Sequence, residues 1–350
     1  MRSPLPLPPD DDAARVPGML LIRTGDGDGD GDGDEADVWN DVLSRMGELP
    51  GMRGPVHGPG ADTETSLPRR LIVAHDPAWR GATVEEVAEA LEQPGIWIPD
   101  LVVLTDDRTA RNQRTRPLLA FGGSDGDISS FWITPRQAAM TYLVLNRPYT
   151  SSAIDDFAER APTDPEWEVA EDEELGEDHF YEPVGVALET LSTPPRYTRP
   201  ARELPLLSHE TDLLVRTDFS DDAAWASLVE RVSQPPYDTS VDDDDDDAED
   251  DGDDEVEGIR FVDDPAFAGA TPEQLMAQVR PSEDVEEMVA DVILIADTTT
   301  LHEPEHRVLV IPLTDDIGLT FRVDPDQVGV MLPNLALGNQ DIEDWRKDEG

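Results

Sequence analysis

Short runs of consecutive apolar residues recur through the second half of the chain. The runs that we interpret as strands are Leu213–Thr217, Ile259–Val262, Val292–Ala296, Val308–Leu313 and Leu319–Val323. Continuous apolar runs of this length, rich in β-branched residues, are typical of strands buried on both faces of a sheet. The turn residues at 315–318 predict that the last two strands form a hairpin.

Helical spacing appears between these runs. Ala224, Trp225, Leu228 and Val232 share one helix face behind an acidic cap at 221–222. Thr271 to Gln274 has the pattern of a helix start, with a capping threonine, a proline at the first helical position and a glutamine that completes a capping box. Thr83 to Glu86 repeats that pattern in the first half. We expect two further helices at 325–332 and 341–345.

The order of these elements is β-α-β-α-β-β-β-α. Strands that are joined by helices are normally parallel with right-handed crossovers, so the first three strands should be parallel and the later ones antiparallel. The predicted fold class is α/β in a mixed α+β arrangement. Its sheet is mostly parallel, then antiparallel, with about five strands flanked by helices.

The first half of the chain repeats the second half block by block. The paired segments are 20–24 with 213–217, 71–91 with 259–279, 100–106 with 291–297, 116–121 with 307–312, 131–137 with 321–327, and 153–160 with 341–348. One block shares the frame Asp-Pro-Ala-aromatic-x-Gly-Ala-Thr. Six blocks in one order predict two tandem copies of one small domain.

The repeat predicts the domain boundaries. Residues 1–14 should form a disordered tail, 15–160 the first α/β repeat, 161–208 an acidic, proline-rich linker and 209–347 the second repeat. The two repeats could pack on each other through their last helices, where Ile154 and Phe157 match Ile342 and Trp345. Those four residues could equally be core residues of each repeat. We expect the intact chain to be monomeric.

The second repeat resembles a known family. The resemblance lies in three segments, LLVRTDFSDDAAW, VDDPAFAGATPEQL and FRVDPDQVGVMLPNLALGN. They are similar to a domain family of unknown function found in actinobacteria and some fungi. The resemblance implies a compact α/β domain and no known activity, so it assigns no catalytic residue and no cofactor.

Acidic residues dominate the charge. The chain has 79 acidic and 26 basic residues, a formal charge of −53, with Lys347 as the one lysine. Such a field repels nucleic acid and anionic lipid and favours a basic protein partner or divalent cations. Much of the acid lies in low-complexity tracts, so a GC-rich genome explains the composition better than a halophilic origin. Alternatively, the charge only keeps the surface solvated.

Cysteine is absent, and no run of apolar residues is long enough to span a membrane. The first residues lack the apolar core of a secretory signal, so we expect a cytoplasmic protein.

Candidate ligand-binding residues lie where strands of the predicted parallel sheet end. A ligand of such a sheet binds beyond the carboxyl ends of its strands. The residues at those ends are Arg23, Thr24, Asp76 and Asp106 in the first repeat and Arg216, Thr217, Asp264 and Asp297 in the second. Carboxylates there could hold Mg²⁺ or Ca²⁺. Alternatively, the aspartates cap turns and helices, and the arginines form internal ion pairs.

Two further patterns suggest metal sites. Asp26, Asp28, Asp30 and Asp37 have the spacing of part of an EF-hand loop, although Gly33 takes the place of its usual apolar residue. His302 and His306 have helical spacing, but Pro304 between them disfavours a helix and hence a zinc pair.

Three classes of function remain open. A non-catalytic binding or interaction protein is the leading hypothesis. A divalent-metal-assisted hydrolase at the strand ends is the second, and an acidic, immunity- or antitoxin-like inhibitor of a basic partner is the third. We predict no catalytic residue and no cofactor, because none of the familiar catalytic or nucleotide-binding motifs occurs.

Overall fold

The computed structural model divides into two compact units, one formed by residues 1–207 and 271–280, the other by residues 208–270 and 281–350. The residues that it describes are 2–9, 16–25, 32–47, 49, 69–122, 130–145, 154, 197, 200–208, 211–234, 258–280, 291–314 and 316–346. All structural statements below concern these residues. Most of the predicted linker and the glycine–aspartate and aspartate tracts lie outside them.

The first unit is built on a five-stranded sheet. Its strands, in the order β2-β1-β3-β4-β5, are β2 (Arg70–Ala74), β1 (Gly18–Arg23), β3 (Leu101–Thr105), β4 (Leu118–Gly122) and β5 (Ser130–Ile133). β1 pairs in parallel with β2 and β3, and β4 and β5 continue the sheet antiparallel. The predicted change from parallel to antiparallel pairing is confirmed.

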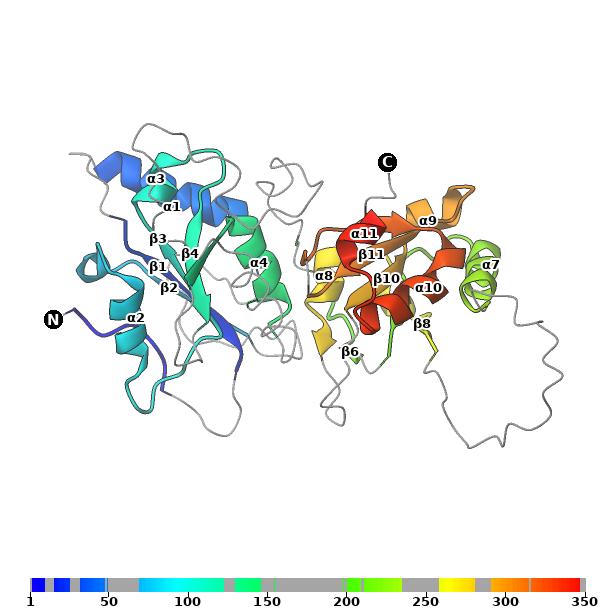
Figure 1. Ribbon diagram of the computed structural model, residues 1–350, viewed down its shortest axis with the longest axis horizontal. Coiled ribbons are helices and arrows are strands. Elements are labelled where there is room, and N and C mark those ends of the chain that lie inside the picture. The colour runs from blue at the N-terminus through cyan, green and yellow to red at the C-terminus, as the bar shows by residue number, and fades with distance from the viewer. Residues whose placement is uncertain are drawn as a thin grey trace. The chain divides into compact units, whose positions relative to one another are not determined.

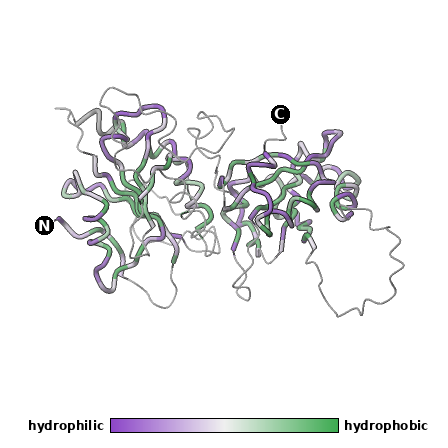
Figure 2. The backbone as a smooth tube through the Cα atoms, viewed as in Figure 1, coloured by the Kyte–Doolittle hydropathy of each residue, from purple (hydrophilic) through white to green (hydrophobic). Residues whose placement is uncertain are grey.

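Helices cover both faces of this sheet. They are α1 (Asp32–Met46), η1 (Pro77–Trp79, a 3-10 turn), α2 (Val84–Leu91), α3 (Asp107–Arg111) and α4 (Pro135–Leu143). α1 packs against α4, and the strands lie between α4 and α2 (Figure 1). Leu20 and Ile22 point to the α2 face, where Val87 and Leu91 meet them in a buried cluster. Both faces of the sheet are therefore buried, as the continuous apolar runs predict. Hydrophobic residues are concentrated along these central strands (Figure 2).

The second unit has the same strand order. Its strands are β8 (Arg260–Val262), β7 (Leu213–Arg216), β10 (Val292–Ala296), β11 (Val308–Pro312) and β12 (Phe321–Val323), paired in that sequence. The first three are parallel and the last two antiparallel. Its helical elements are α7 (Asp222–Val232), η3 (Pro265–Phe267), α9 (Thr298–His302), α10 (Pro325–Ala336) and α11 (Ile342–Arg346). The predicted mixed α/β fold class is confirmed in both units.

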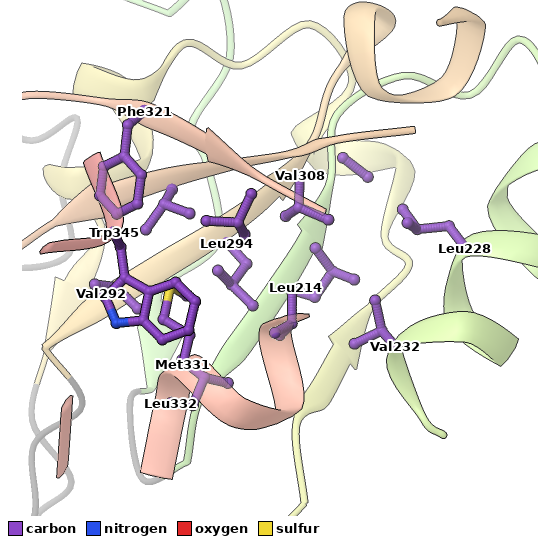
Figure 3. Close-up of a cluster of buried hydrophobic side chains, with 14 of the residues drawn as sticks. Leu214, Leu228, Val232, Val292, Leu294, Val308, Phe321, Met331, Leu332 and Trp345 are labelled. Atoms are coloured by element: carbon purple, nitrogen blue, oxygen red, sulfur yellow. The ribbon is translucent and has the colours of Figure 1, made fainter. Parts of the chain in front are cut away.

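The core of the second unit lies between one sheet face and α7, α10 and α11. Leu214 and Leu294 of the central strands belong to one buried cluster with Leu228 of α7 and Met331 of α10 (Figure 3). Trp345 closes the same cluster and is 8% exposed. Ile342 is also buried there. The two candidate docking residues of the second repeat are thus core residues of their own unit. In the first repeat Ile154 is half-buried, and Phe157 lies outside the described residues.

One segment groups differently from the predicted boundaries. α8 (Pro272–Met276) and β9 (Val279–Arg280), which the repeat assigned to the second copy, belong to the first unit. α8 packs against α4, and β9 pairs with β6 (Leu207–Ser208). The buried guanidinium of Arg69 donates to the carbonyl of Ala277 over 2.9 Å. These long-range contacts leave no trace in a sequence repeat.

Sheet register corrects one block of the repeat by one residue. Val103 lies opposite Ala120, and the matching Leu294 lies opposite Val310. Ala120 therefore corresponds to Val310, and Arg116 corresponds to His306 instead of Arg307. Both residues have a positive φ, 50° at Arg116 and 54° at His306.

Candidate functional site

The shared Asp-Pro-Ala frame forms the same turn in both units. Asp76 Oδ1 accepts from the amide of Ala78, and Asp264 Oδ1 accepts from that of Ala266, each over 2.8 Å. The following aromatic residue is buried, because Trp79 is 2% exposed and Phe267 1%. Asp76 and Asp264 therefore terminate the strand and start a 3-10 turn, which is the structural alternative of the sequence analysis.

The glycine of the Asp-Pro-Ala frame allows a left-handed backbone turn. Gly81 and Gly269 have φ values of 61° and 71°, a region that favours glycine. This conformation turns the amide of Gly81 to the carbonyl of Thr24 over 2.6 Å, and that of Gly269 to Thr217 over 2.8 Å. The threonine that follows then caps the next helix in a complete capping box, as predicted at Thr83 and at Thr271.

Thr24 and Thr217 are tied to the neighbouring strand rather than presented to solvent. The hydroxyl of Thr24 donates to the carbonyl of Thr105, and the hydroxyl of Thr217 donates to that of Ala296. Both side chains are buried. Each threonine thus connects its own strand end to two other backbone segments at the carboxyl edge.

Asp106 and Asp297 cap the short helices that follow the third strand of each unit. Asp106 Oδ1 accepts from the amides of Arg108 and Thr109, and Asp297 Oδ1 accepts from the amide of Thr300 over 2.9 Å. A further hydrogen bond is common to the two units. Thr109 and Thr300 each donate their hydroxyl to the backbone carbonyl just before the fourth strand.

The two carboxylates differ in what faces them. Arg322 of β12 grips Asp297 with two hydrogen bonds, Nη2 to Oδ2 over 2.6 Å and Nη1 to Oδ1 over 3.2 Å. Burial raises the pKa of Asp297, but the bonds from Arg322 and Thr300 outweigh burial and hold it below its ordinary value. Trp132 takes the place of Arg322 in the first unit, with the Arg108 guanidinium 4.9 Å from its ring centroid. There burial dominates and raises the pKa of Asp106.

Arg216 is a buried cation at the same edge. It is 2% exposed and bonds to Asp222 over 2.7 Å and Asp263 over 3.2 Å. Its guanidinium carbon lies 4.5 Å from the ring centroid of Phe219 and 5.6 Å from that of Trp225. The arrangement matches the internal ion pair that the sequence analysis offered as an alternative. Its counterpart Arg23 is half-buried and has interactions of its own.

The structure also brings together a serine, a histidine and an aspartate beside α9, a group that the sequence did not predict. Ser220 Oγ lies 3.0 Å from His302 Nε2, and Asp218 Oδ2 lies 3.5 Å from the same nitrogen. In a catalytic triad the aspartate binds the other ring nitrogen, Nδ1, so this geometry does not activate the serine. Asp218 instead accepts hydrogen bonds from Ser220, and the bonds from the Ser220 side chain and amide lower the pKa of Asp218. His306, the second predicted histidine, binds the carbonyl of Thr300 through Nδ1.

A second unpredicted pair of acids lies where the central strands of the second unit begin. Asp212 precedes β7 and Asp291 precedes β10, and these strands are parallel neighbours. Burial, with the charge of Asp291, raises the pKa of Asp212 to about 6. Asp291 Oδ1 accepts from the hydroxyl of Thr314 over 3.2 Å. An acid just before an apolar strand is the signal that could have identified both residues.

Most of the predicted EF-hand pattern falls outside the part of the chain that the structure describes. Asp26, Asp28 and Asp30 lie outside it, and Asp37 is a residue of α1. Within the described ranges, no three histidine or acidic side chains are grouped as they would be around a metal ion. No described helix has the length and apolarity needed to cross a membrane.

Comparison with known proteins identifies one family. Residues 211–350 match the family model of a domain of unknown function, DUF6924, which carries no known activity. The expected resemblance of the second repeat is therefore confirmed. No curated protein and no solved structure matches the chain.

Proposed function

We propose that the chain is a non-catalytic binding protein of the cytoplasm, built from two copies of one α/β domain. The duplication is supported by the common strand order, by the common register of the parallel pairs and by the recurrence of the Asp-Pro-Ala turn with its glycine bond to a strand-end threonine. Chance agreement at all three levels would require the same local choices to be made twice.

One observation carries the non-catalytic assignment. The four strand-end aspartates all accept hydrogen bonds from backbone amides of the turn or helix that follows, as described for Asp76, Asp106, Asp264 and Asp297. A metal site needs carboxylate oxygens that converge on a common point. Each of these four carboxylates instead accepts from the backbone that follows it, and Asp297 and Asp76 also accept from Arg322 and Ser3, which favours a structural role over the metal-assisted hydrolase.

The partner that this charge favours is a basic protein. The formal charge is −53, so a cationic partner gains long-range attraction and a fast encounter. The immunity-like inhibitor is a special case of this proposal, in which the basic partner is a toxin.

Fluorescence anisotropy with the full chain and a labelled oligoarginine tests the proposal, with oligoglutamate as control. We expect saturable binding of the cation that weakens with salt and that the urea-unfolded chain does not reproduce. Equal binding by the unfolded chain would reduce the effect to charge alone. Turnover of ester or phosphoester substrates with Mg²⁺ that Asp106→Asn or Asp297→Asn abolishes would establish the enzyme instead.

A further inference from the structure

The five N–H groups of one arginine are all bound on the surface of the first unit. Arg2 Nη1 donates to the carbonyls of Ala78 over 2.8 Å and Arg80 over 2.9 Å. Arg2 Nη2 donates to the carbonyl of Gly81 over 3.2 Å and to Glu86 Oε2 over 2.6 Å. Arg2 Nε completes the set with Glu86 Oε2 over 3.1 Å. Complete use of a guanidinium fork is the hallmark of specific arginine recognition.

The acceptors are arranged by the Asp-Pro-Ala turn and α2. The 3-10 turn and the left-handed Gly81 direct three carbonyls to one point, and the capping box holds Glu86 beside them. Trp79 lies below, with its ring centroid 5.8 Å from the guanidinium carbon. The bond from Arg2 holds the pKa of Glu86 below its ordinary value. We call the three carbonyls, Glu86 and the Trp79 ring the guanidinium cradle.

Residues 2–9, which we call the strap, continue from the cradle along the first unit. Ser3 donates its hydroxyl to Asp76 Oδ2 over 2.7 Å. Leu5 is 9% exposed and belongs to the buried cluster with Trp79 and Trp97. The amide of Trp97 then donates to the carbonyl of Pro8 over 2.9 Å. We expected a disordered tail here, but polar anchors at Arg2 and Ser3 and an apolar anchor at Leu5 attach these residues to the first unit.

We propose that the cradle and the adjoining cluster form a peptide-binding site, which the strap fills in cis. When the strap detaches, the site binds an extended segment of a second polypeptide that carries an arginine followed by proline and leucine. This inference deepens the proposed function, on which it rests, because it names the class of basic partner and the surface that receives it.

The chemistry of the strap defines the ligand. Its sequence, RSPLPLPP, carries prolines at 4, 6, 8 and 9, which favour a preformed extended helix that binds at low entropic cost. A lysine cannot replace the arginine, because its three donors at one nitrogen cannot reach acceptors spread around a planar fork. The ion pair of the cradle lies at the surface, since the Glu86 side chain is 47% exposed and that of Arg2 25%.

The test uses the full chain and a labelled synthetic peptide with the sequence of residues 2–9. Wild type and the strap variant Arg2→Ala/Leu5→Ala are titrated by fluorescence anisotropy. The cis strap competes at an effective concentration on the order of millimolar. We therefore expect the strap variant to bind the peptide at least tenfold tighter than wild type. Amide exchange in β1 and β3 verifies its fold, and Arg2→Ala alone serves if the double variant unfolds.

Two matched substitutions test specificity on the strap-variant background. Glu86→Gln should weaken the peptide at least tenfold, whereas Glu89→Gln, which removes the same charge from an exposed position on the same helix, should leave affinity unchanged. A peptide with lysine in place of arginine should bind at least tenfold more weakly than the arginine peptide.

The outcomes separate this inference from the proposed function. Equal affinity for the lysine peptide, or equal losses with both glutamate substitutions, overturns the cradle while salt-dependent binding of oligoarginine still supports a basic partner. Peptide binding without any binding of oligoarginine overturns the general basic partner and keeps the cradle. A wild-type dimer that Arg2→Ala abolishes would make the strap of a second copy the occupant and overturn a foreign partner.

Discussion

Removing Arg322 separates the two roles of Asp297, which caps α9 and forms an ion pair with Arg322. The substitution Arg322→Met keeps the apolar stem but deletes four hydrogen bonds, two to Asp297 and one each to Thr300 Oγ1 and the Arg307 carbonyl. The side chains of the pair are 17% and 27% exposed, so the remaining carboxylate stays largely desolvated. The Asp297 carboxylate also accepts from the amide and hydroxyl of Thr300.

We expect a loss of unfolding free energy that lies between the values for surface ion pairs and for fully buried ones. Hydrogen bonds to a charged group contribute about 1.5–3 kcal/mol, and breaking a fully buried ion pair costs roughly 3–5 kcal/mol. We therefore expect Arg322→Met to lower the free energy of unfolding of the second unit by about 2–3 kcal/mol. Adding Asp297→Asn should restore part of the loss, because it removes the unpaired charge but keeps an oxygen that can cap α9.

Arg231 supplies a matched control. It also donates two hydrogen bonds to one carboxylate, from Nε and Nη2 to Asp326 over 3.0 and 3.1 Å, but these side chains are 30% and 67% exposed. Solvent screens such a pair, so Arg231→Met should cost less than about 1 kcal/mol. Native-state hydrogen exchange of the β10 and α9 amides is the suitable assay, because a chain with two units need not unfold in one step.

The pH dependence adds a second criterion. Arg322 lowers the folded pKa of Asp297, so the stabilisation is present above the unfolded pKa and disappears as the pH falls through the folded pKa. The difference between wild type and Arg322→Met should accordingly shrink below about pH 4. An Arg322→Met loss no greater than that of Arg231→Met, or one that is independent of pH, would refute the reasoning.

Three further predictions concern the same carboxyl and amino edges. Burial raises the folded pKa of Asp106, so the charged carboxylate destabilises the first unit at neutral pH, and this destabilisation fades as the pH falls. Asp106→Asn should reduce that pH dependence, while the new amide oxygen still caps α3. Hydrogen exchange of the β3 amides at pH 7 and 5 would reveal the change. Asp212, with its pKa raised to about 6, should make the second unit more stable as the pH falls from 7 to about 5, and Asp212→Asn should stabilise it at pH 7; an unchanged urea midpoint at both pH values would contradict this. Arg216→Lys should cost about 1–2 kcal/mol, because lysine cannot bond Asp222, Asp263 and the Asp218 carbonyl together or stack on Phe219. Native-state hydrogen exchange of the β7 amides measures the loss.

Local patterns in the sequence were sufficient for the elements and for most of the fold class. The capping boxes at Thr83 and Thr271, the Asp-Pro-Ala turns and the buried strands all depend on residues within one turn or one strand of each other. The sequence also offered the structural role of the strand-end aspartates as an alternative. It could do so because an aspartate caps through amides only two or three residues away.

Contacts between distant segments were decided by the tertiary structure alone. Arg322 finds Asp297 because β12 and β10 both flank β11, and the equivalent position in the first unit carries Trp132. The one-residue shift in the alignment of β4 with β11 was decided by sheet pairing, because a repeat of similar apolar residues leaves the register ambiguous. Arg2 and Glu86 are 84 residues apart, so no local pattern could pair them. A guanidinium selects its partners by where acceptors converge in space, and only the folded chain brings three carbonyls and a carboxylate to that point.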